Sequence, residues 1–191
     1  MIVATVLKSG GIYTPEHVYK LRDMVNKHIP CGTFTCLTDL DLDVETISLT
    51  DGYEGWWAKI ELFKIKGPVL FFDLDTIIRG DISHIIEKVK DEKFVILRDF
   101  YRKGNSMQSS MMYWNGDMSF ICEKFKENKA TFEGDQDFIE SVVDKAVYWQ
   151  DVSDEIVSFK CNILRRELLD SDKVVIFHGQ PRPWRQHVIP Y

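Results

Sequence analysis

The sequence predicts an α/β fold in which helices flank a mixed, mainly parallel sheet. Short β-rich runs alternate with helical repeats along the first half of the chain, which is typical of parallel sheets. The run Val69–Phe72 is apolar at every position, as expected of a central strand that is buried on both faces. Because 191 residues suffice for one core and are few for two, we expect a single domain over 1–191.

The chain opens with a predicted strand–turn–helix unit. Ile2–Leu7 is the strand, and Ser9-Gly10-Gly11 is a flexible turn. Thr14-Pro15 suits the N-cap and first position of a helix, and apolar residues recur at helical spacing at positions 18, 21, 25 and 29.

The remaining elements follow in the same alternating order. Further strands are expected at 33–38, 44–49, 69–72, 94–97, 111–114 and 174–177. An amphipathic helix is expected at 56–65, bounded by Gly67-Pro68, with further helices at 118–126 and 135–143. The stretch 153–172 shows no readable pattern.

Charge and hydropathy exclude two classes of function. A formal net charge of −6 disfavours a broad nucleic-acid surface, which needs clustered Lys and Arg. The apolar run at the start is too short for a signal peptide, and no later run reaches bilayer-spanning length. We therefore expect a soluble, cytoplasmic protein with no nucleic-acid partner and no membrane span.

Four scattered cysteines show no paired Cys-x-x-Cys spacing of a metal site. Reduced, partly buried thiols are the expectation for Cys31, Cys36, Cys122 and Cys161. A disulfide between Cys31 and Cys36 stays open for an oxidising compartment.

The acidic motif Asp73-Leu74-Asp75 follows the buried strand directly. In open α/β sheets ligands bind at the carboxyl ends of strands, which is where this motif falls. Hard carboxylate oxygens suit Mg²⁺ or Mn²⁺, which commonly join carboxylates to substrate phosphates. The alternative is an acidic turn before a helix near Asp81.

Four blocks in the same order resemble the family 8 glycosyltransferases, the group of glycogenin and bacterial galactosyltransferases. The first is a Lys-bearing helix at 58–63, then Gly67-Pro68 and an apolar strand leading to Asp73-Leu74-Asp75. The others are Ser109-Ser110 before the apolar run 111–114, Asp135-Gln136-Asp137 at a helix start, and His178-Gly179 followed by Arg182-Pro183-Trp184. The resemblance covers most of the chain and implies a GT-A fold, with a nucleotide-binding half at about 1–80 and an acceptor-side half at about 81–191.

The resemblance also implies a metal site. Asp73, Asp75 and His178 would ligate Mn²⁺ (or Mg²⁺), and diphosphate oxygens would complete its shell. Taken alone, His178 reads as a core histidine ending a strand. The closing block departs from the family because His178 and Gly179 are adjacent and Arg182 stands near the usual Lys, so Arg182 or Arg185 would hold phosphate.

The remaining donor-site residues come from several segments. Backbone groups of Val6, Leu7 and Lys8 would contact the nucleotide base. Tyr13 would stack on the base, or else be an ordinary loop aromatic. Asp39 would reach the ribose, although an acidic turn is the simpler interpretation. Lys59 would neutralise phosphate or bind the sugar, or else belong to the solvated side of its helix. The resemblance gives as donor-binding residues Val6, Leu7, Lys8, Tyr13, Asp39, Lys59, Asp73, Leu74, Asp75, Ser109, Ser110, Gly179 and Arg182.

Catalytic roles are expected for Lys59 and for the acidic block Asp135-Gln136-Asp137. Gln136 would lie near the reacting face in a retaining enzyme, and an Asp would act as base in an inverting one. Carboxylates at a helix start also stabilise the helix dipole, which is the structural alternative. The expected activity is metal-dependent transfer of a sugar, from a UDP-sugar above all, to a hydroxyl of a glycan or other acceptor.

Two other functions remain open. A haloacid-dehalogenase-type phosphohydrolase also has an apolar strand before Asp-x-Asp, but it places Thr or Val where Ile77 stands here and has its motif closer to the N-terminus. A non-catalytic nucleotide-sugar binding domain is the second alternative. Measured sugar transfer would separate it from an enzyme.

Overall fold

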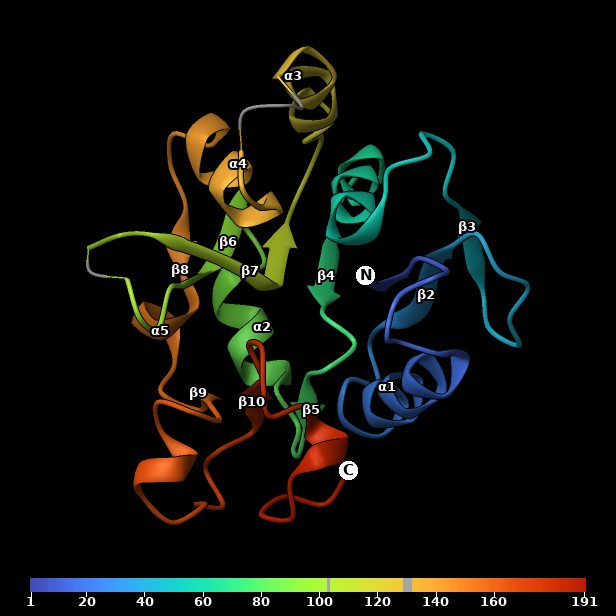
Figure 1. Ribbon diagram of the computed structural model, residues 1–191. Helices are drawn as coiled ribbons and strands as arrows, with labels where there is room; N and C mark the ends of the chain where they lie inside the picture. Colours follow the sequence, from blue (N-terminus) through green and yellow to red (C-terminus); the bar gives the residue numbers. More distant parts are fainter. Residues whose placement is uncertain (103, 129–131) are drawn as a thin grey trace.

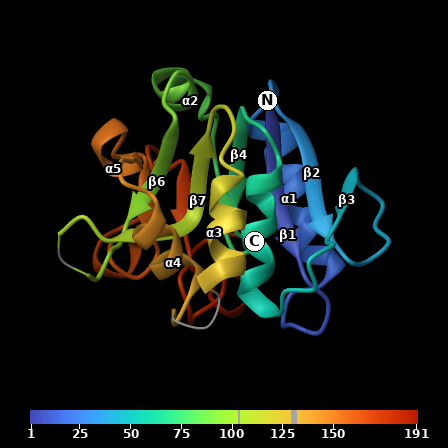
Figure 2. The same cartoon turned by 90° about the horizontal axis from the view of Figure 1, so that it is seen from above.

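The computed structural model describes residues 1–102, 104–128 and 132–191, and its main feature is a seven-stranded sheet. The strands lie in the order β3-β2-β1-β4-β7-β6-β8, most of them visible side by side in Figure 2. Their bounds are β1 (Ile2–Leu7), β2 (Thr33–Thr38), β3 (Thr46–Ser48), β4 (Val69–Phe72), β6 (Phe94–Arg98), β7 (Met107–Trp114) and β8 (Val147–Tyr148). Only β7 runs antiparallel to its neighbours within this sheet, which confirms the mixed, mainly parallel α/β fold.

Helices cover both faces of the large sheet (Figure 1). On one face lie α1 (Pro15–His28) and α2 (Ser83–Val89), with the short α5 (Trp149–Val152) packed into the same core. On the other lie α3 (Phe120–Asn128), α4 (Asp135–Val142) and the 3₁₀ helix η1 (Gly55–Lys64).

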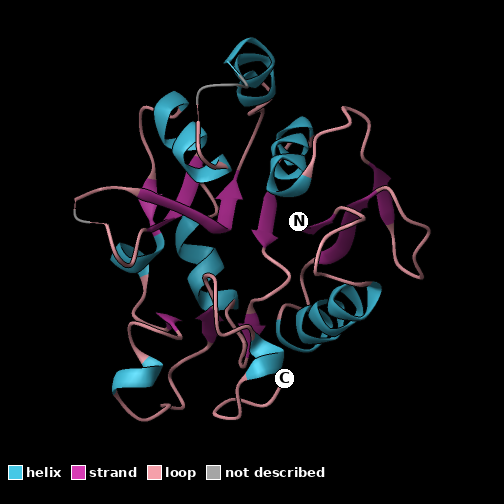
Figure 3. Cartoon of the chain, viewed as in Figure 1, coloured by secondary structure: helices cyan, strands magenta, loops and turns pink. Residues whose placement is uncertain are grey.

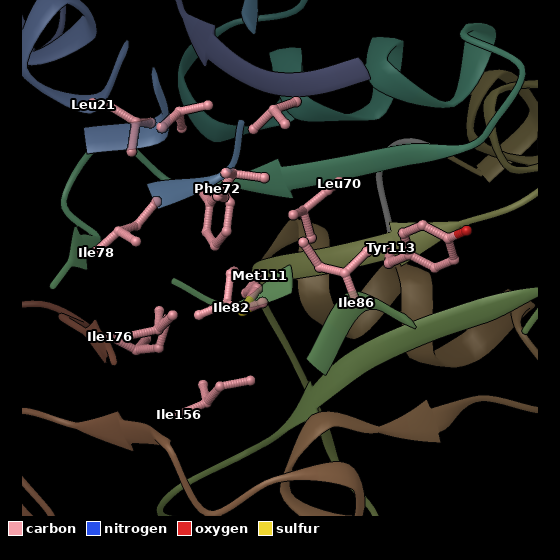
Figure 4. Close-up of a cluster of buried hydrophobic side chains, with 14 of the residues drawn as sticks. Leu21, Leu70, Phe72, Ile78, Ile82, Ile86, Met111, Tyr113, Ile156 and Ile176 are labelled. Carbon is pink, nitrogen blue, oxygen red and sulfur yellow. The ribbon is translucent and has the colours of Figure 1, made fainter. Parts of the chain in front are cut away.

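The central strand β4 contributes to both cores. Because side chains alternate across a strand, Leu70 and Phe72 pack in the core with α1 and α2, part of which Figure 4 shows. Val69 and Phe71 pack in the core with η1, α3 and α4. All four residues are at most 1% exposed, as the unbroken apolar run predicts.

A second, three-stranded sheet lies apart from the large one (Figure 3). It has the order β5-β10-β9, with β5 (Ile77–Ile78), β10 (Val174–Ile176) and β9 (Ile156–Ser158). A separate core packs against it, near the 3₁₀ turns η2 (Ile163–Arg165) and η3 (Pro183–Arg185). The stretch 153–172 is unreadable in sequence because its elements are three residues long, too short for a periodic signal.

Several predicted boundaries differ from the structure. The helix expected at 56–65 is a 3₁₀ helix, and all of 58–63 are buried instead of one face alone. The carboxylate of Glu61 is satisfied in this buried place because it accepts hydrogen bonds from the backbone N–H groups of Thr50 (2.8 Å) and Asp51 (3.0 Å). The strand expected at 44–49 shortens to β3. The strand expected at 111–114 begins earlier, at Met107. The sequence did not indicate this start because residues 108–110 are polar although they are buried.

All four cysteines are free. Cys36 and Cys122 are buried, and burial raises the pKa of their thiols to about 12 and about 11. Cys31 is exposed. Among the described residues, none of the helices has the length and apolar character needed to cross a membrane.

These environments predict which thiols react. With an alkylating reagent at pH 8, Cys31 should be modified first, while Cys36 and Cys122 should react only on unfolding, because the thiolate is the nucleophile and burial suppresses it. Peptide mass spectrometry over time measures this order. Modification of Cys36 in the native protein as fast as that of Cys31 would contradict the burial described above.

Candidate functional site

A cavity of about 630 Å³ opens at the carboxyl ends of β1 and β4. These two strands are neighbours in the sheet, and such sheet edges are the usual ligand-binding places in open α/β folds. The cavity is lined by segments that are distant in sequence, from both predicted halves of the chain.

Most of the residues that the sequence singled out line this cavity. They are Val6, Leu7, Lys8, Tyr13, Lys59, Asp73, Leu74, Asp75, Ser109, Ser110, Asp135, Gln136, His178, Gly179 and Arg182. Asp39 and Asp137 do not line it, and neither does Arg185, the alternative to Arg182 as phosphate holder. Sequence reasoning missed Glu54, Trp56 and Gln108 as lining residues. The available signal was proximity in the chain, since Glu54 and Trp56 closely precede Lys59 and Gln108 directly precedes Ser109.

The backbone holds Asp73 where β4 ends. Its N–H donates to the carbonyl of Ser110 on the neighbouring β7 (2.9 Å), and its own carbonyl accepts from the N–H of Thr76 (3.0 Å), which closes a turn. Phe72, the last residue of β4, is held in turn by the neighbouring β1, because the Thr5 hydroxyl donates to the carbonyl of Phe72 (2.9 Å). The turn brings both carboxylates of the acidic motif to the cavity wall.

Lys59 ties three segments together on the cavity floor. Its Nζ lies 2.9 Å from Oδ1 of Asp73 and 3.1 Å from Oδ2 of Asp135, and it donates to the Ser109 hydroxyl (3.1 Å). Ser109 in turn donates to Asp135 (2.6 Å). Burial alone would lower the pKa of Lys59, but the carboxylates of Asp135 and Asp73 outweigh it and raise this pKa. Lys59 is therefore a buried cation and not part of a solvated helix face.

Asp75 is the most enclosed carboxylate in the cavity, with 2% of its surface exposed. Its Oδ2 accepts hydrogen bonds from the Tyr13 hydroxyl (3.0 Å) and from Nη1 of Arg182, which also donates to the Tyr13 oxygen (2.8 Å). Burial raises the pKa of Asp75 to about 6, and repulsion from Asp73 adds to the shift. Burial also raises the pKa of Tyr13.

His178 lines the same cavity and has partners of its own. Its Nε2 lies 2.7 Å from the Ser158 hydroxyl, and its ring stacks on Phe100 with centroids 5.4 Å apart. Burial lowers its pKa to about 4, and the positive charge of Lys160 adds to this, so the imidazole is neutral at pH 7. Gly179, which follows it, has φ +78°, a conformation that favours glycine.

The predicted metal ligands fit a cation only in part. Asp73 and Asp75 are two oxygen donors close enough to repel each other, which suits a divalent ion. His178 is not grouped with them: within 1–102, 104–128 and 132–191 no cluster of three His, Cys, Asp or Glu side chains is placed to hold a metal. The carboxylates pair with Lys59 and Arg182.

Of the predicted residues outside the cavity, the two aspartates have clear partners elsewhere. Asp39 accepts from Nζ of Lys8 (2.5 Å) and from both the N–H and the hydroxyl of Ser9 (2.9 and 2.6 Å), so it supports the loop that lines the cavity. Asp137 lies 2.7 Å from Nη1 of Arg102. Both ionic contacts lie at the surface.

Comparison with solved structures shows a shared fold at low sequence identity. LgtC, solved as an active-site mutant, superposes with a TM-score of 0.71 at 12% identity, covering 100% of this chain and 92% of LgtC. The glycosyltransferase GlyE of Streptococcus pneumoniae superposes with a TM-score of 0.69 at 13% identity. That match covers 98% of this chain, which spans only 57% of GlyE.

A more distant likeness is to mouse xyloside xylosyltransferase 1, with a TM-score of 0.50, 11% identity and coverage of 94% of this chain and 97% of that one. No family model matches the sequence, and no curated protein matches it either. The structural likeness confirms the GT-A fold that the sequence blocks implied.

The Lys59 network predicts a large stability effect. Lys59→Met removes the buried cation between Asp135 and the partly exposed Asp73. It should lower the free energy of unfolding by about 3–5 kcal/mol, the usual loss when one partner of a buried pair is removed. Lys66→Met, which removes an exposed pair with Asp117, should leave the free energy of unfolding nearly unchanged, because solvent screens that pair. Urea denaturation measures both, and equal losses would show that Lys59 is solvated.

Proposed function

We propose that this protein is a metal-dependent glycosyltransferase that moves a sugar from a nucleotide-diphosphate sugar, above all a UDP-sugar, to a hydroxyl of a glycan or other acceptor. The observation that carries the proposal is the pair Asp73 and Asp75 at the end of β4, inside a cavity of ligand size and beside the cations Lys59 and Arg182. The GT-A fold shared with LgtC and GlyE supports it.

The charges of the cavity support a divalent cation as part of the binding site. Its lining holds four carboxylates, Glu54, Asp73, Asp75 and Asp135, and three cations, Lys8, Lys59 and Arg182. A diphosphate would thus enter a site that already has one excess negative charge. A Mn²⁺ or Mg²⁺ ion held by Asp73 and Asp75 would supply the missing positive charge and stabilise the departing diphosphate.

The chain's own residues would divide the remaining work. The planar guanidinium of Arg182 suits phosphate oxygens, and Lys59 keeps Asp73 and Asp135 oriented while adding positive charge. Gln136 and Asp135 line the cavity, so these two residues of the acidic block would face the sugar and the acceptor hydroxyl. Asp137 lies outside the cavity, bonded to Arg102, and takes no role in this proposal.

The names of the structural neighbours agree with this reaction class. A galactosyltransferase, LgtC, has been solved in complex with donor and acceptor sugar analogs, and this chain covers 91% of it with a TM-score of 0.68. The haloacid-dehalogenase alternative needs a carboxylate free to attack phosphate. The ion pairs of Asp73 with Lys59 and of Asp75 with Arg182 keep both carboxylates ionised, so the GT-A fold, and not these contacts, favours sugar transfer over that alternative.

Nucleotide-dependent stabilisation tests the proposed donor. With Mn²⁺ present and UDP at a hundredfold excess over its Kd, the folded state should gain about 2.7 kcal/mol. That gain raises the melting temperature by on the order of 5–10 °C for a chain of this size. Asp75→Asn should remove most of the shift, whereas the exposed Asp117→Asn, outside the cavity, should keep it.

Turnover separates an enzyme from a binding domain. Incubation with the UDP-sugar that stabilises best, Mn²⁺ and a panel of glycan acceptors should release UDP and extend an acceptor, detectable by mass spectrometry. Binding without release would support the binding-domain alternative. Absence of any nucleotide shift, together with hydrolysis of p-nitrophenyl phosphate, would support the phosphohydrolase instead.

A further inference from the structure

The segment 179–191 packs against the first turns of α1 and carries Arg182 to the cavity. In Figure 1 it is drawn in red and lies beside α1 and β5. Trp184 meets His17 and Tyr13 edge-on, with centroids 4.2 and 5.7 Å apart, and Tyr191 lies beneath Nζ of Lys20 at 4.1 Å. These aromatic contacts hold the segment in one position over the acidic motif.

Arg182 takes up the carboxylate of Asp75 in this position. Its Nη1 donates to Oδ2 of Asp75 and to the oxygen of Tyr13, while Tyr13 donates to the same Oδ2. Asp75 is 2% exposed. An ion that approaches from solvent therefore meets Asp73, a quarter of whose side chain is exposed, but not a free Asp75.

Arg182 also has a hydrogen-bond donor that its contact with Asp75 leaves unused. Its Nε is buried and has no hydrogen-bond partner among the described residues, although an unpaired buried donor destabilises the folded state. Arg182 lines the cavity, and the enclosed Tyr191 hydroxyl of the same segment is also without a partner in the described chain. The contact of Arg182 with Asp75 thus leaves Nε of Arg182 unsatisfied, and an anionic ligand in the cavity would supply an acceptor for it.

We propose that Arg182 is an exchangeable internal counterion of Asp75, which couples the binding of a divalent cation to the binding of a diphosphate. This inference rests on the proposed function. A cation alone must displace Arg182 and leave a guanidinium without its anion. A diphosphate alone must draw Arg182 away and leave Asp75 unpaired in a poorly solvated site, so the exchange is favourable only when both ligands arrive.

Cation binding without nucleotide tests this exchange. We expect wild-type protein to bind Mn²⁺ weakly, and Arg182→Gln to bind it on the order of tenfold more tightly, because Asp75 is released; tenfold corresponds to about 1.4 kcal/mol. Electron paramagnetic resonance of free Mn²⁺ measures both affinities without any sugar transfer. Arg185→Gln removes the same charge three residues away, on a residue outside the cavity lining, and should leave the affinity within about twofold, as expected for screened charges.

Two further variants separate the exchange from misfolding. Tyr13→Phe keeps the ion pair but removes one hydroxyl donor from Asp75, so it should tighten Mn²⁺ binding by less than Arg182→Gln does. Arg182→Gln combined with Asp75→Asn should return the affinity to the wild-type value or below. Equal Mn²⁺ affinity in wild type, Arg182→Gln and Arg185→Gln would overturn the proposal.

A second titration keeps this inference apart from the proposed function. Wild-type protein is titrated with UDP, with and without Mn²⁺, by calorimetry. If UDP binds with Mn²⁺ and Arg182→Gln shows no gain in Mn²⁺ affinity, the exchange is wrong and the donor assignment stands. If UDP does not bind even with Mn²⁺, the proposed function fails, whatever the Mn²⁺ affinities are.

Discussion

Two carboxylates follow the fully buried strand β4 of this protein, and each is neutralised by a cation from another part of the chain. Asp73 pairs with Lys59 at 2.9 Å, and Asp75 pairs with Arg182. Ionised carboxylates in a poorly solvated place are costly unless they are paired and hydrogen-bonded. Much of the architecture around the cavity can be understood as the means of delivering those two cations.

Each cation reaches the motif because another element has a fixed place. Lys59 points inward because η1 is buried along 58–63 against the core beside β4. The antiparallel β7 places Ser109 next to Lys59 and Asp135. The small sheet carries the chain back toward β4 through β10, and the aromatic contacts of 179–191 with α1 then set the position of Arg182. The site is thus shared between both halves of the chain.

The sequence predicted the position of the site better than the direction of individual side chains. The unbroken apolar run of β4 determined where Asp73 and Asp75 would emerge, and strand order alone brings the ends of β1 and β4 together. Asp137 follows Gln136 directly, but each helical residue turns by about 100°, and Arg102 from the β6–β7 loop captures its carboxylate. No sequence pattern predicts the pairing of Asp137 with Arg102.

The pairing of His178 is likewise not predictable from the sequence. His178 lines the cavity, but its hydrogen-bond partner Ser158 comes from β9, inside the stretch that has no periodic pattern. Its grouping with Asp73 and Asp75 was implied by family resemblance alone. Among the described residues the imidazole belongs instead to a cluster with Phe100 and Tyr101. Local patterns predict elements, whereas pairings between distant segments depend on tertiary packing.

The joint binding of a divalent cation and a diphosphate can be tested in a crystal structure of the protein with UDP and Mn²⁺, by the anomalous scattering of manganese. We expect a manganese peak at the oxygens of Asp73 and Asp75, with the diphosphate in the cavity and Arg182 turned from Asp75 to phosphate. A nucleotide bound outside this cavity, or a diphosphate held there while Arg182 remains on Asp75 and no manganese is bound, would contradict it.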